Sequence, residues 1–444
     1  MLFTRRDIFK IVLPLIIEQL LAVTVGMFDS MMVSSAGEAA ISGVSLVDSI
    51  NVLLIQLFAA LSTGGAVLIS QSLGKKNLEK TAHICKQLIL TVFACSMLVS
   101  IIAITLRTPL LKLIFGKIES DVMANAQIYF LITALSYPFL GLYNSGAAIF
   151  RSFGNSKVSM IASLYMNIIN ICGNALFIFG LGWGAAGAAI ATLIARAFGA
   201  MMMQYLLRGK MSVVPIRGLL KTRPDFVTIK NVCRIGIPSG IENSMFQMGK
   251  VLTQSVVSSC GTTHIAANAV ANTLSQLQFI PAAAVNLAVI TIVGRCIGAG
   301  RTDEAKKMSR KLLLMAYSTI WIATVLIFLL LNPLLGLYDL SATSTKLAWT
   351  LMAMHSVMVS TIWPLSFSTP NSFRAAGDVK FTLVIATLSM WICRVGLSYV
   401  FAKMLGLGVI GVWMAMFSDW ICRTAFFVPH YFRGKWLNIR KPLV

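Results

Sequence analysis

Long apolar runs separated by short polar links make up most of the chain. The runs lie at about 9–35, 47–73, 84–106, 124–149, 158–180, 185–207, 235–259, 269–294, 312–335, 344–370, 381–402 and 407–429. A transmembrane helix needs about 20 predominantly apolar residues, so each of these twelve runs is long enough to span a bilayer. Helices satisfy their backbone polar groups internally, as lipid requires. The pattern therefore predicts an all-α polytopic membrane protein with twelve transmembrane helices.

Composition agrees with that pattern. Of the 444 residues, 57% are hydrophobic and 12% are charged, whereas soluble domains have about 45–50% and about 25%. This balance excludes an ordinary soluble enzyme. The chain has no P-loop, GxSxG or HExxH motif, and its 8 cysteines and 4 histidines are scattered without a ligand pattern. We therefore expect no catalytic activity, no resident metal and no cofactor, and an intramembrane enzyme is a disfavoured alternative.

The net charge of +22 has two interpretations, nucleic-acid binding and basic cytoplasmic loops. Most of the 37 Lys and Arg residues fall at the two ends and in alternate links, of which the longest is 208–234. The positive-inside rule then places both termini in the cytoplasm, which an even number of spans also requires. We expect a multi-pass protein of the cell membrane, in contact with the lipid bilayer, that binds no nucleic acid.

The two halves of the chain resemble each other at an offset of about 224 residues. Pro14 matches Pro238, and Glu18 matches Glu242. The loop Arg151–Lys157 matches Arg374–Lys380 at nearly the same offset. We predict an amino-terminal six-helix lobe at 1–207, a cytoplasmic linker at 208–234 and a carboxy-terminal six-helix lobe at 235–444. Because each half has an even number of spans, the halves are parallel repeats, which in transporters move against each other around a central cavity.

Acidic residues inside the apolar runs are candidate functional groups, because a charge at mid-span costs about 2.5–3.5 kcal/mol. Asp29 has Thr253 as its repeat partner, so it suggests an ion or proton site in one half only; the alternative is a structural carboxylate paired with a buried amide. Glu18 and Glu242 each lie four residues after a proline. They are expected to line the cavity and attract cations, or alternatively to cap the backbone groups that the proline frees.

Amides in the fifth run add to this set. Asn170 and Asn174 are four residues apart and share one helix face, and Thr192 in the sixth run could add a hydroxyl. Amide and hydroxyl oxygens suit a hard cation such as Na⁺. The alternative is hydrogen bonding between neighbouring helices.

The order and spacing of several motifs resemble the MATE (multidrug and toxic compound extrusion) family over nearly the whole chain. The motifs are Pro14 with Phe28–Ser30, Gln71–Gly74, Arg151–Asn155, Asn170–Gly180, Gly184–Thr192, Gly294–Gly300 and Arg374–Asp378. The resemblance implies a V-shaped, two-lobed antiporter that exports organic cations against Na⁺ or H⁺ entry. It also implies a cation-coupling site at Asp29, Asn170, Asn174 and Thr192, the only site where a metal ion, Na⁺, is expected.

The chain departs from the family at three positions. Some members have an acid where this chain has Asn174, so Asp29 is the single carboxylate of the site. Some members carry an acid deep in the seventh span and another in the tenth. In this chain the corresponding region of the seventh span has Gln247, and the tenth span has no acid. A carboxy-lobe ion site is therefore not expected, although Glu242 could substitute for it.

The expected cargo is an amphipathic organic cation or a zwitterion. Glu18, Glu242 and Gln247 are the predicted cavity residues, and Pro14 and Pro238 are the predicted hinges. We expect a monomer. The alternative within the superfamily is a lipid-linked saccharide flippase, and cavity-facing Arg196 and Arg394 would favour the lipid phosphate that such a protein carries.

Overall fold

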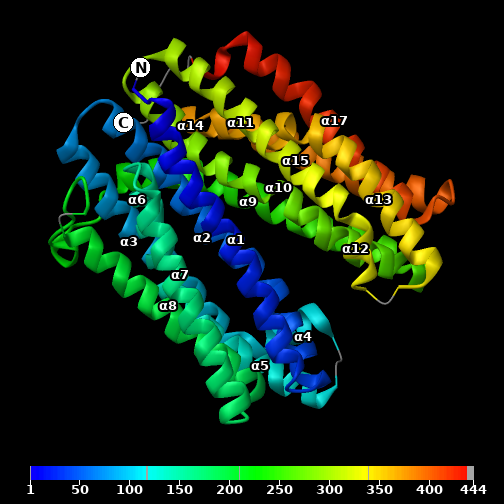
Figure 1. Ribbon diagram of the computed structural model, residues 1–444. Helices are drawn as coiled ribbons and strands as arrows, with labels where there is room; N and C mark the ends of the chain where they lie inside the picture. The colour runs from blue at the N-terminus through cyan, green and yellow to red at the C-terminus, as the bar shows by residue number, and fades with distance from the viewer. Residues whose placement is uncertain (1, 117–118, 210, 339, 438–444) are drawn as a thin grey trace. The chain divides into compact units, whose positions relative to one another are not determined.

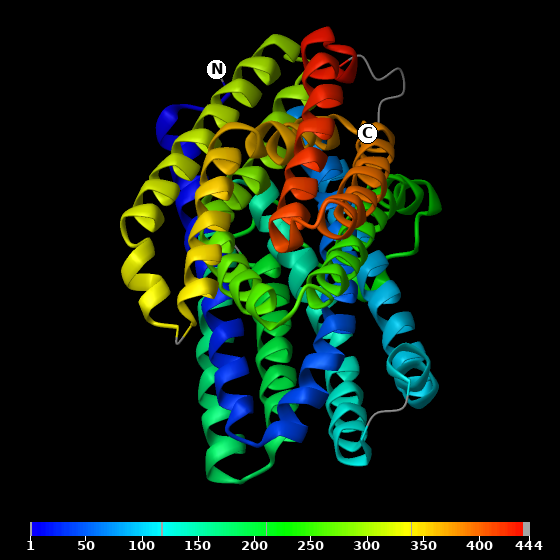
Figure 2. The ribbon, with the colours of Figure 1, turned by 90° about the vertical axis from the view of Figure 1, so that its right-hand side faces the viewer.

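The computed structural model describes residues 2–116, 119–209, 211–338 and 340–437, in which every regular element is a helix (Figure 1, Figure 2). The α-helices are α1 (Arg5–Ser34), α2 (Glu38–Gly74), α3 (Leu78–Thr105), α4 (Arg107–Phe115), α5 (Ser120–Leu135), α6 (Tyr137–Ser152), α7 (Ser156–Asn174), α8 (Gly184–Arg208), α9 (Phe226–Ser258), α10 (Thr262–Gly298), α11 (Thr302–Leu329), α12 (Leu331–Gly336), α13 (Ala342–Thr361), α14 (Thr369–Ala376), α15 (Val379–Ser389), α16 (Leu397–Tyr399) and α17 (Gly408–Arg433). Short π-helical segments are η1 (Ala175–Gly180), η3 (Pro364–Ser368), η4 (Met390–Gly396) and η5 (Val400–Met404), and 3₁₀ turns are η2 (Leu219–Lys221) and η6 (Lys435–Leu437).

Each of the twelve predicted runs falls on a helical stretch, which confirms the all-α membrane fold. By length and apolar composition, eight helices of the described chain could cross a membrane, or nine if α5 and α6, bent by 45°, form one span. The count is lower than twelve because several helices carry charges or breaks. Glu242 and Lys250 lie on α9, and Asp419 lies on α17. The tenth run is broken between α13, which ends at Thr361, and η3, which begins at Pro364.

Contacts divide the chain into two compact units. The amino-terminal unit is Phe3–Gly240, and the carboxy-terminal unit is Ile241–Val444 with Met1–Leu2. The dividing point lies within α9. The contacts therefore group residues 208–240 with the amino-terminal unit, and the sequence-based division into two lobes and a linker stays a prediction.

The amino-terminal unit begins with a capped helix. Thr4 caps α1: its hydroxyl accepts a hydrogen bond from the Asp7 backbone N–H at 3.3 Å, and the Asp7 carboxylate accepts one from the Thr4 backbone N–H at 2.9 Å. In this unit α1 packs on α7, and α7 and α8 lie side by side (Figure 1). This arrangement places residues of the first, fifth and sixth predicted spans next to one another.

Glycine allows the first part of α9 to pack closely against α2 in the same unit. A Cβ atom on Gly64 would lie 2.6 Å from the Val232 carbonyl oxygen, and one on Gly236 would lie 2.8 Å from the Leu61 Cα atom. Neither distance is possible for a larger residue without moving backbone. This contact explains why the first turns of α9 belong to the amino-terminal unit.

Candidate functional site

The predicted coupling residues come together inside the amino-terminal unit. Asp29 on α1 accepts a hydrogen bond at 2.5 Å from the side-chain amide of Asn174, the last residue of α7. The Asn174 amide also faces the Asn170 carbonyl oxygen at 3.5 Å, and the Asn170 amide donates to the Thr192 hydroxyl on α8 at 3.2 Å. We call Asp29, Asn170, Asn174 and Thr192 the coupling cluster.

The coupling cluster is polar and largely shielded. Asn174 is fully buried, Asn170 is buried, and Asp29 is half-buried. The π-helical segment η1 begins directly after Asn174. Segments of this kind interrupt the regular helical ladder and are common at functional sites.

The oxygens of this cluster fit a hard cation. The Asn174 carbonyl oxygen is buried and accepts no hydrogen bond within the described residues. It lies on the side chain that contacts the Asp29 carboxylate, and carboxylate, amide and hydroxyl oxygens are the ligands that hard cations take. In the described part of the chain no three His, Cys, Asp or Glu side chains gather. Any cation here would therefore depend on one carboxylate and neutral oxygens.

Glu18 and Glu242 each form an ion pair with an arginine of their own unit. Glu18 lies 3.5 Å from the Arg151 guanidinium and accepts a 2.7 Å hydrogen bond from the Ser159 hydroxyl. Glu242 lies 2.7 Å from the Arg374 guanidinium. Both carboxylates are buried and contact side chains on other helices. Their charges are thus balanced within each unit, and their predicted role in cargo binding stays a prediction.

The other predicted residues lie on helices. Pro14 lies inside α1 and Pro238 inside α9, where each removes one helical hydrogen bond. Gln247 is half-buried on α9. Arg196, on α8, donates a hydrogen bond to the Ser136 hydroxyl at 2.7 Å.

The partners of the two glutamates are not among the residues that the sequence predicts for the site. In the sequence, Arg151 and Arg374 stand out only as parts of matching loops, and Ser159 does not stand out. The signal was present, because the same offset that matches Glu18 with Glu242 also matches Arg151 with Arg374 to within one residue. Two matched acids and two matched bases in apolar surroundings predict a pair in each half.

Comparisons with known proteins give the same family for both halves of the chain. The family model described as MatE matches residues 14–176 and 238–400, so each match begins at one of the two paired prolines. The uncharacterised transporter YisQ of Bacillus subtilis is 27% identical over 425 residues, which cover 94% of this chain and 91% of YisQ. A probable multidrug resistance protein NorM of Thermotoga maritima is 24% identical over 440 residues, which cover 97% of this chain and 93% of that NorM protein.

Solved structures share the fold. The crystal structure of a MATE protein in complex with MaD3S superposes with a TM-score of 0.90 at 20% identity, covering 97% of this chain and 96% of that one. A MATE structure in the bent conformation superposes with a TM-score of 0.88 over 98% of this chain and 96% of its own, also at 20% identity.

Proposed function

Because the chain belongs to the MatE family of multidrug efflux transporters, we propose that it exports amphipathic organic compounds in exchange for inward Na⁺ or H⁺ bound at the coupling cluster. The observation that carries this proposal is the 2.5 Å hydrogen bond between the single carboxylate, Asp29, and the Asn174 amide. The unpartnered Asn174 carbonyl oxygen beside it supports cation binding at the same place.

Neutralisation of Asp29 is the proposed coupling step. A ligand shifts a conformational equilibrium only if it binds one state better than the other. A Na⁺ or H⁺ that neutralises Asp29 removes the cost of a carboxylate in apolar surroundings, so α1, α7 and α8 can repack. Pro14, inside α1, is the proposed hinge for that movement. One charge moving down 100 mV yields about 2.3 kcal/mol, enough for a nearly fifty-fold cargo gradient.

Transport in vesicles tests this proposal. The purified protein is reconstituted into proteoliposomes, and export of a cationic dye is measured under imposed Na⁺ or H⁺ gradients. Asp29→Asn is expected to reduce gradient-driven export to the level of protein-free vesicles, because an amide carries no negative charge for Na⁺ or H⁺ to neutralise. Dye binding without a gradient should change little.

Asp48→Asn is the matched control for that experiment. Asp48 lies in the same unit on α2, where its carboxylate accepts hydrogen bonds from Asn51 and the Tyr129 hydroxyl, each at 3.1 Å. The control is expected to keep coupled export. Coupled export by Asp29→Asn, or its loss in both variants alike, would overturn the assignment of coupling to Asp29.

The proposed cargo includes organic cations and zwitterions, with Glu18 and Glu242 near the cargo's positive charge. The double variant Glu18→Gln and Glu242→Gln tests this point, because it should weaken export of cationic dyes at normal expression. Unchanged export would leave both glutamates with only their ion pairs to Arg151 and Arg374.

The proposed setting is the cell membrane, with both termini in the cytoplasm and the protein acting as a monomer. The multi-pass membrane protein itself follows from the family and the apolar helices. The concentration of Lys and Arg in alternate links supports the orientation. A flippase for lipid-linked saccharides is not proposed, since the relatives described above include a probable multidrug resistance protein.

A further inference from the structure

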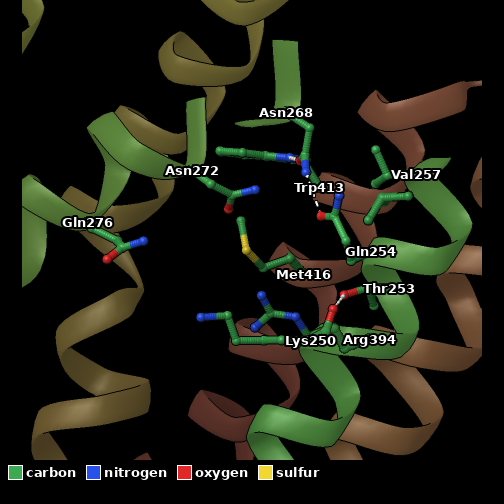
Figure 3. A pocket seen from close by; sticks show the side chains of 11 residues that line it. Lys250, Thr253, Gln254, Val257, Asn268, Asn272, Gln276, Arg394, Trp413 and Met416 are labelled. Atoms are coloured by element: carbon green, nitrogen blue, oxygen red, sulfur yellow. Dashed lines mark hydrogen bonds between the residues drawn. The ribbon is translucent and has the colours of Figure 1, made fainter. Parts of the chain in front are cut away.

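The carboxy-terminal unit contains a polar cavity of about 220 Å³ (Figure 3). Its walls come from α9, α10, η4 and α17. Lys250 and Arg394 line it, and none of the eleven lining residues that the structure describes is an acid. In Figure 3 the ends of both basic side chains lie at one side of the cavity, with the Asn272 and Gln276 amides across from them. We call this space the basic cavity.

The two cations of the basic cavity have little compensation. Arg394 is only 8% exposed, and its guanidinium donates no hydrogen bond to any described residue. The nearest carboxylate, Asp419, is 3.9 Å from Arg394 but 2.8 Å from Arg423, to which it accepts a hydrogen bond. Lys250 forms no ion pair within the described chain.

Both cations of the basic cavity lie near one aromatic ring. The guanidinium of Arg394 lies 5.2 Å from the centre of the Phe246 ring, and the Lys250 ammonium lies 5.9 Å from it. Arg423 lies 5.7 Å from the same ring. Three cations around one ring with one buried carboxylate leave an excess of positive charge, and like charges held together in this way attract an anion.

The neutral lining suits an anion that carries an apolar group. The side-chain amides of Asn272 and Gln276 make no hydrogen bond within the described residues, so both remain available to a ligand. Apolar contact comes from Val257, Val412 and Met416. A pocket with a few convergent polar groups and apolar walls is the usual form of a small-molecule site.

One wall of the cavity is already ordered by its own hydrogen bonds. Asn268 donates to the Gln254 side-chain oxygen at 2.9 Å and accepts from the Trp413 indole N–H at 2.8 Å. These bonds satisfy Asn268 and hold α9, α10 and α17 together around the cavity. The polar lining side chains that form no hydrogen bond within the described residues are therefore Lys250, Arg394, Asn272 and Gln276.

The internal repeat relates this cavity to the coupling cluster. At an offset of 224, Thr253 corresponds to Asp29 and Met416 to Thr192, and both Thr253 and Met416 line the cavity. Lys250 corresponds to Gly26. Thr253 therefore keeps a polar group where the first half has the acid Asp29, Met416 replaces the hydroxyl of Thr192 with an apolar side chain, and the base Lys250 is added one turn away from Thr253.

We propose that the basic cavity binds the carboxylate of a small organic anion, with Lys250 and Arg394 holding the carboxylate and the apolar wall holding the rest of the molecule. This site lies beyond the proposed coupling function and does not depend on it. Arginine can bind a carboxylate through two parallel hydrogen bonds, and charge-assisted bonds of this kind are the strong ones. The volume of about 220 Å³ is below the range of about 300–1,000 Å³ typical of drug-sized ligands.

Binding of benzoate to the purified full-length protein in an uncharged detergent tests the proposal. Isothermal titration calorimetry compares benzoate with neutral benzamide, with cationic benzamidine and with acetate, which lacks the ring. We expect benzoate to bind about ten-fold or more tightly than each of the other three. Equal or tighter binding of benzamide or benzamidine would overturn the charge assignment, and equal binding of acetate would overturn the organic part of the proposal.

Variants locate the binding. Lys250→Gln and Arg394→Gln should each weaken benzoate binding about ten-fold or more. Because Arg394 is buried beside Asp419 and its variant can misfold, Lys250→Gln is the deciding variant. Lys403→Gln removes a cation of the same unit that does not line the cavity and should change the affinity less than two-fold.

The variants also separate this proposal from the coupling proposal. Asp29→Asn should leave benzoate affinity unchanged, so loss of coupled export in that variant carries no weight for or against the basic cavity. Unchanged benzoate affinity in folded Lys250→Gln, or an equal loss in Lys403→Gln, would show that benzoate binds elsewhere and would overturn the proposal.

Discussion

The amino-terminal and carboxy-terminal units each contain an equivalent buried ion pair. They differ at the positions that correspond to the coupling cluster. Glu18 with Arg151 and Glu242 with Arg374 occupy corresponding positions in the two halves. Asp29, in contrast, corresponds to Thr253, and Lys250 lies one turn before that threonine. The pair that joins helices within a unit has therefore been kept, whereas the polar site has changed the sign of its charge.

This difference shows which features duplication preserves. A buried ion pair is costly to lose one partner at a time, because the remaining charge has no compensation. A polar site facing a cavity is less constrained, since solvent or a ligand can satisfy its groups. Under the two proposals above, the units keep the same buried ion pair and bind ions of opposite charge.

The largest expected effect concerns the buried ion pair that each unit contains. Arg374→Gln leaves Glu242, whose other carboxylate oxygen already has no partner, without a described counter-charge. We expect this variant to lose about 3–5 kcal/mol of stability. Arg151→Gln should lose less, about 1–3 kcal/mol, because Glu18 keeps its hydrogen bond from Ser159. Thermal unfolding in detergent measures both, and a larger loss in Arg151→Gln would contradict the pairing.

The second prediction gives the carboxy-terminal unit the acid of the other half. Thr253→Asp places a carboxylate three residues from Lys250 on α9, where it competes for the ammonium. Benzoate affinity should fall by about ten-fold or more. Thr253→Val, which is similar in size and uncharged, should bind benzoate nearly as the unchanged protein does. Titration calorimetry measures both affinities. Unchanged benzoate affinity in Thr253→Asp would contradict the assignment of the anion site to Lys250.

The third prediction adds a second acid to the coupling cluster. Asn174→Asp places two carboxylates at hydrogen-bond distance, where they hold one proton between them. We expect the ratio of H⁺-driven to Na⁺-driven dye export to rise about ten-fold. Asn167→Asp, on the same helix but outside the cluster, serves as the control and should keep the original ratio. An unchanged ratio in Asn174→Asp would remove Asn174 from the coupling site.

The smallest effects are expected at two Asp–His pairs, one in each unit. Asp378 lies 2.7 Å from His430 and is partly buried, whereas Asp225 lies 3.0 Å from His83 and is more exposed. Asp378→Asn should lower stability by about 1 kcal/mol and Asp225→Asn by less. Thermal unfolding of the two variants gives the order, and a larger loss in Asp225→Asn would contradict it.

The Asp225 pair also predicts a pH dependence. Hydrogen bonds from Thr228 and His83 hold the pKa of Asp225 at about 2, below its ordinary 3.8. A lowered pKa stabilises the folded protein at pH values above 3.8, and that contribution is lost as the pH falls towards 2. The stability difference between Asp225→Asn and the unchanged protein should therefore be full near neutral pH and disappear in acid.

The sequence predicted the fold because its signals are local and strong. Apolar runs and the placement of Lys and Arg depend on the bilayer and not on tertiary contacts, so the helices were found in order. The contact between α2 and α9 at Gly64 and Gly236 could not be predicted, because nothing in a single sequence shows which glycines face one another. The boundary between the units depends on that contact.

The site was predictable only in part. Asp29, Asn170 and Asn174 stand out as polar groups in apolar runs, and the structure brings them together with Thr192. The basic cavity did not stand out, since Lys250 and Arg394 are far apart in sequence and each alone resembles an isolated span charge. Whether Asp419 would compensate Arg394 or Arg423 depends on distances that the sequence does not contain.

Two readouts on the same preparations test most directly whether the units have sites of opposite charge. Gradient-driven dye export and benzoate affinity are measured for the unchanged protein, Asp29→Asn and Lys250→Gln. We expect Asp29→Asn to lose coupled export and keep benzoate binding, and Lys250→Gln to bind benzoate about ten-fold more weakly and keep coupled export. If either substitution removes both properties in a folded protein, or if Asp29→Asn removes benzoate binding and Lys250→Gln removes coupled export, the two units do not have separate sites of opposite charge.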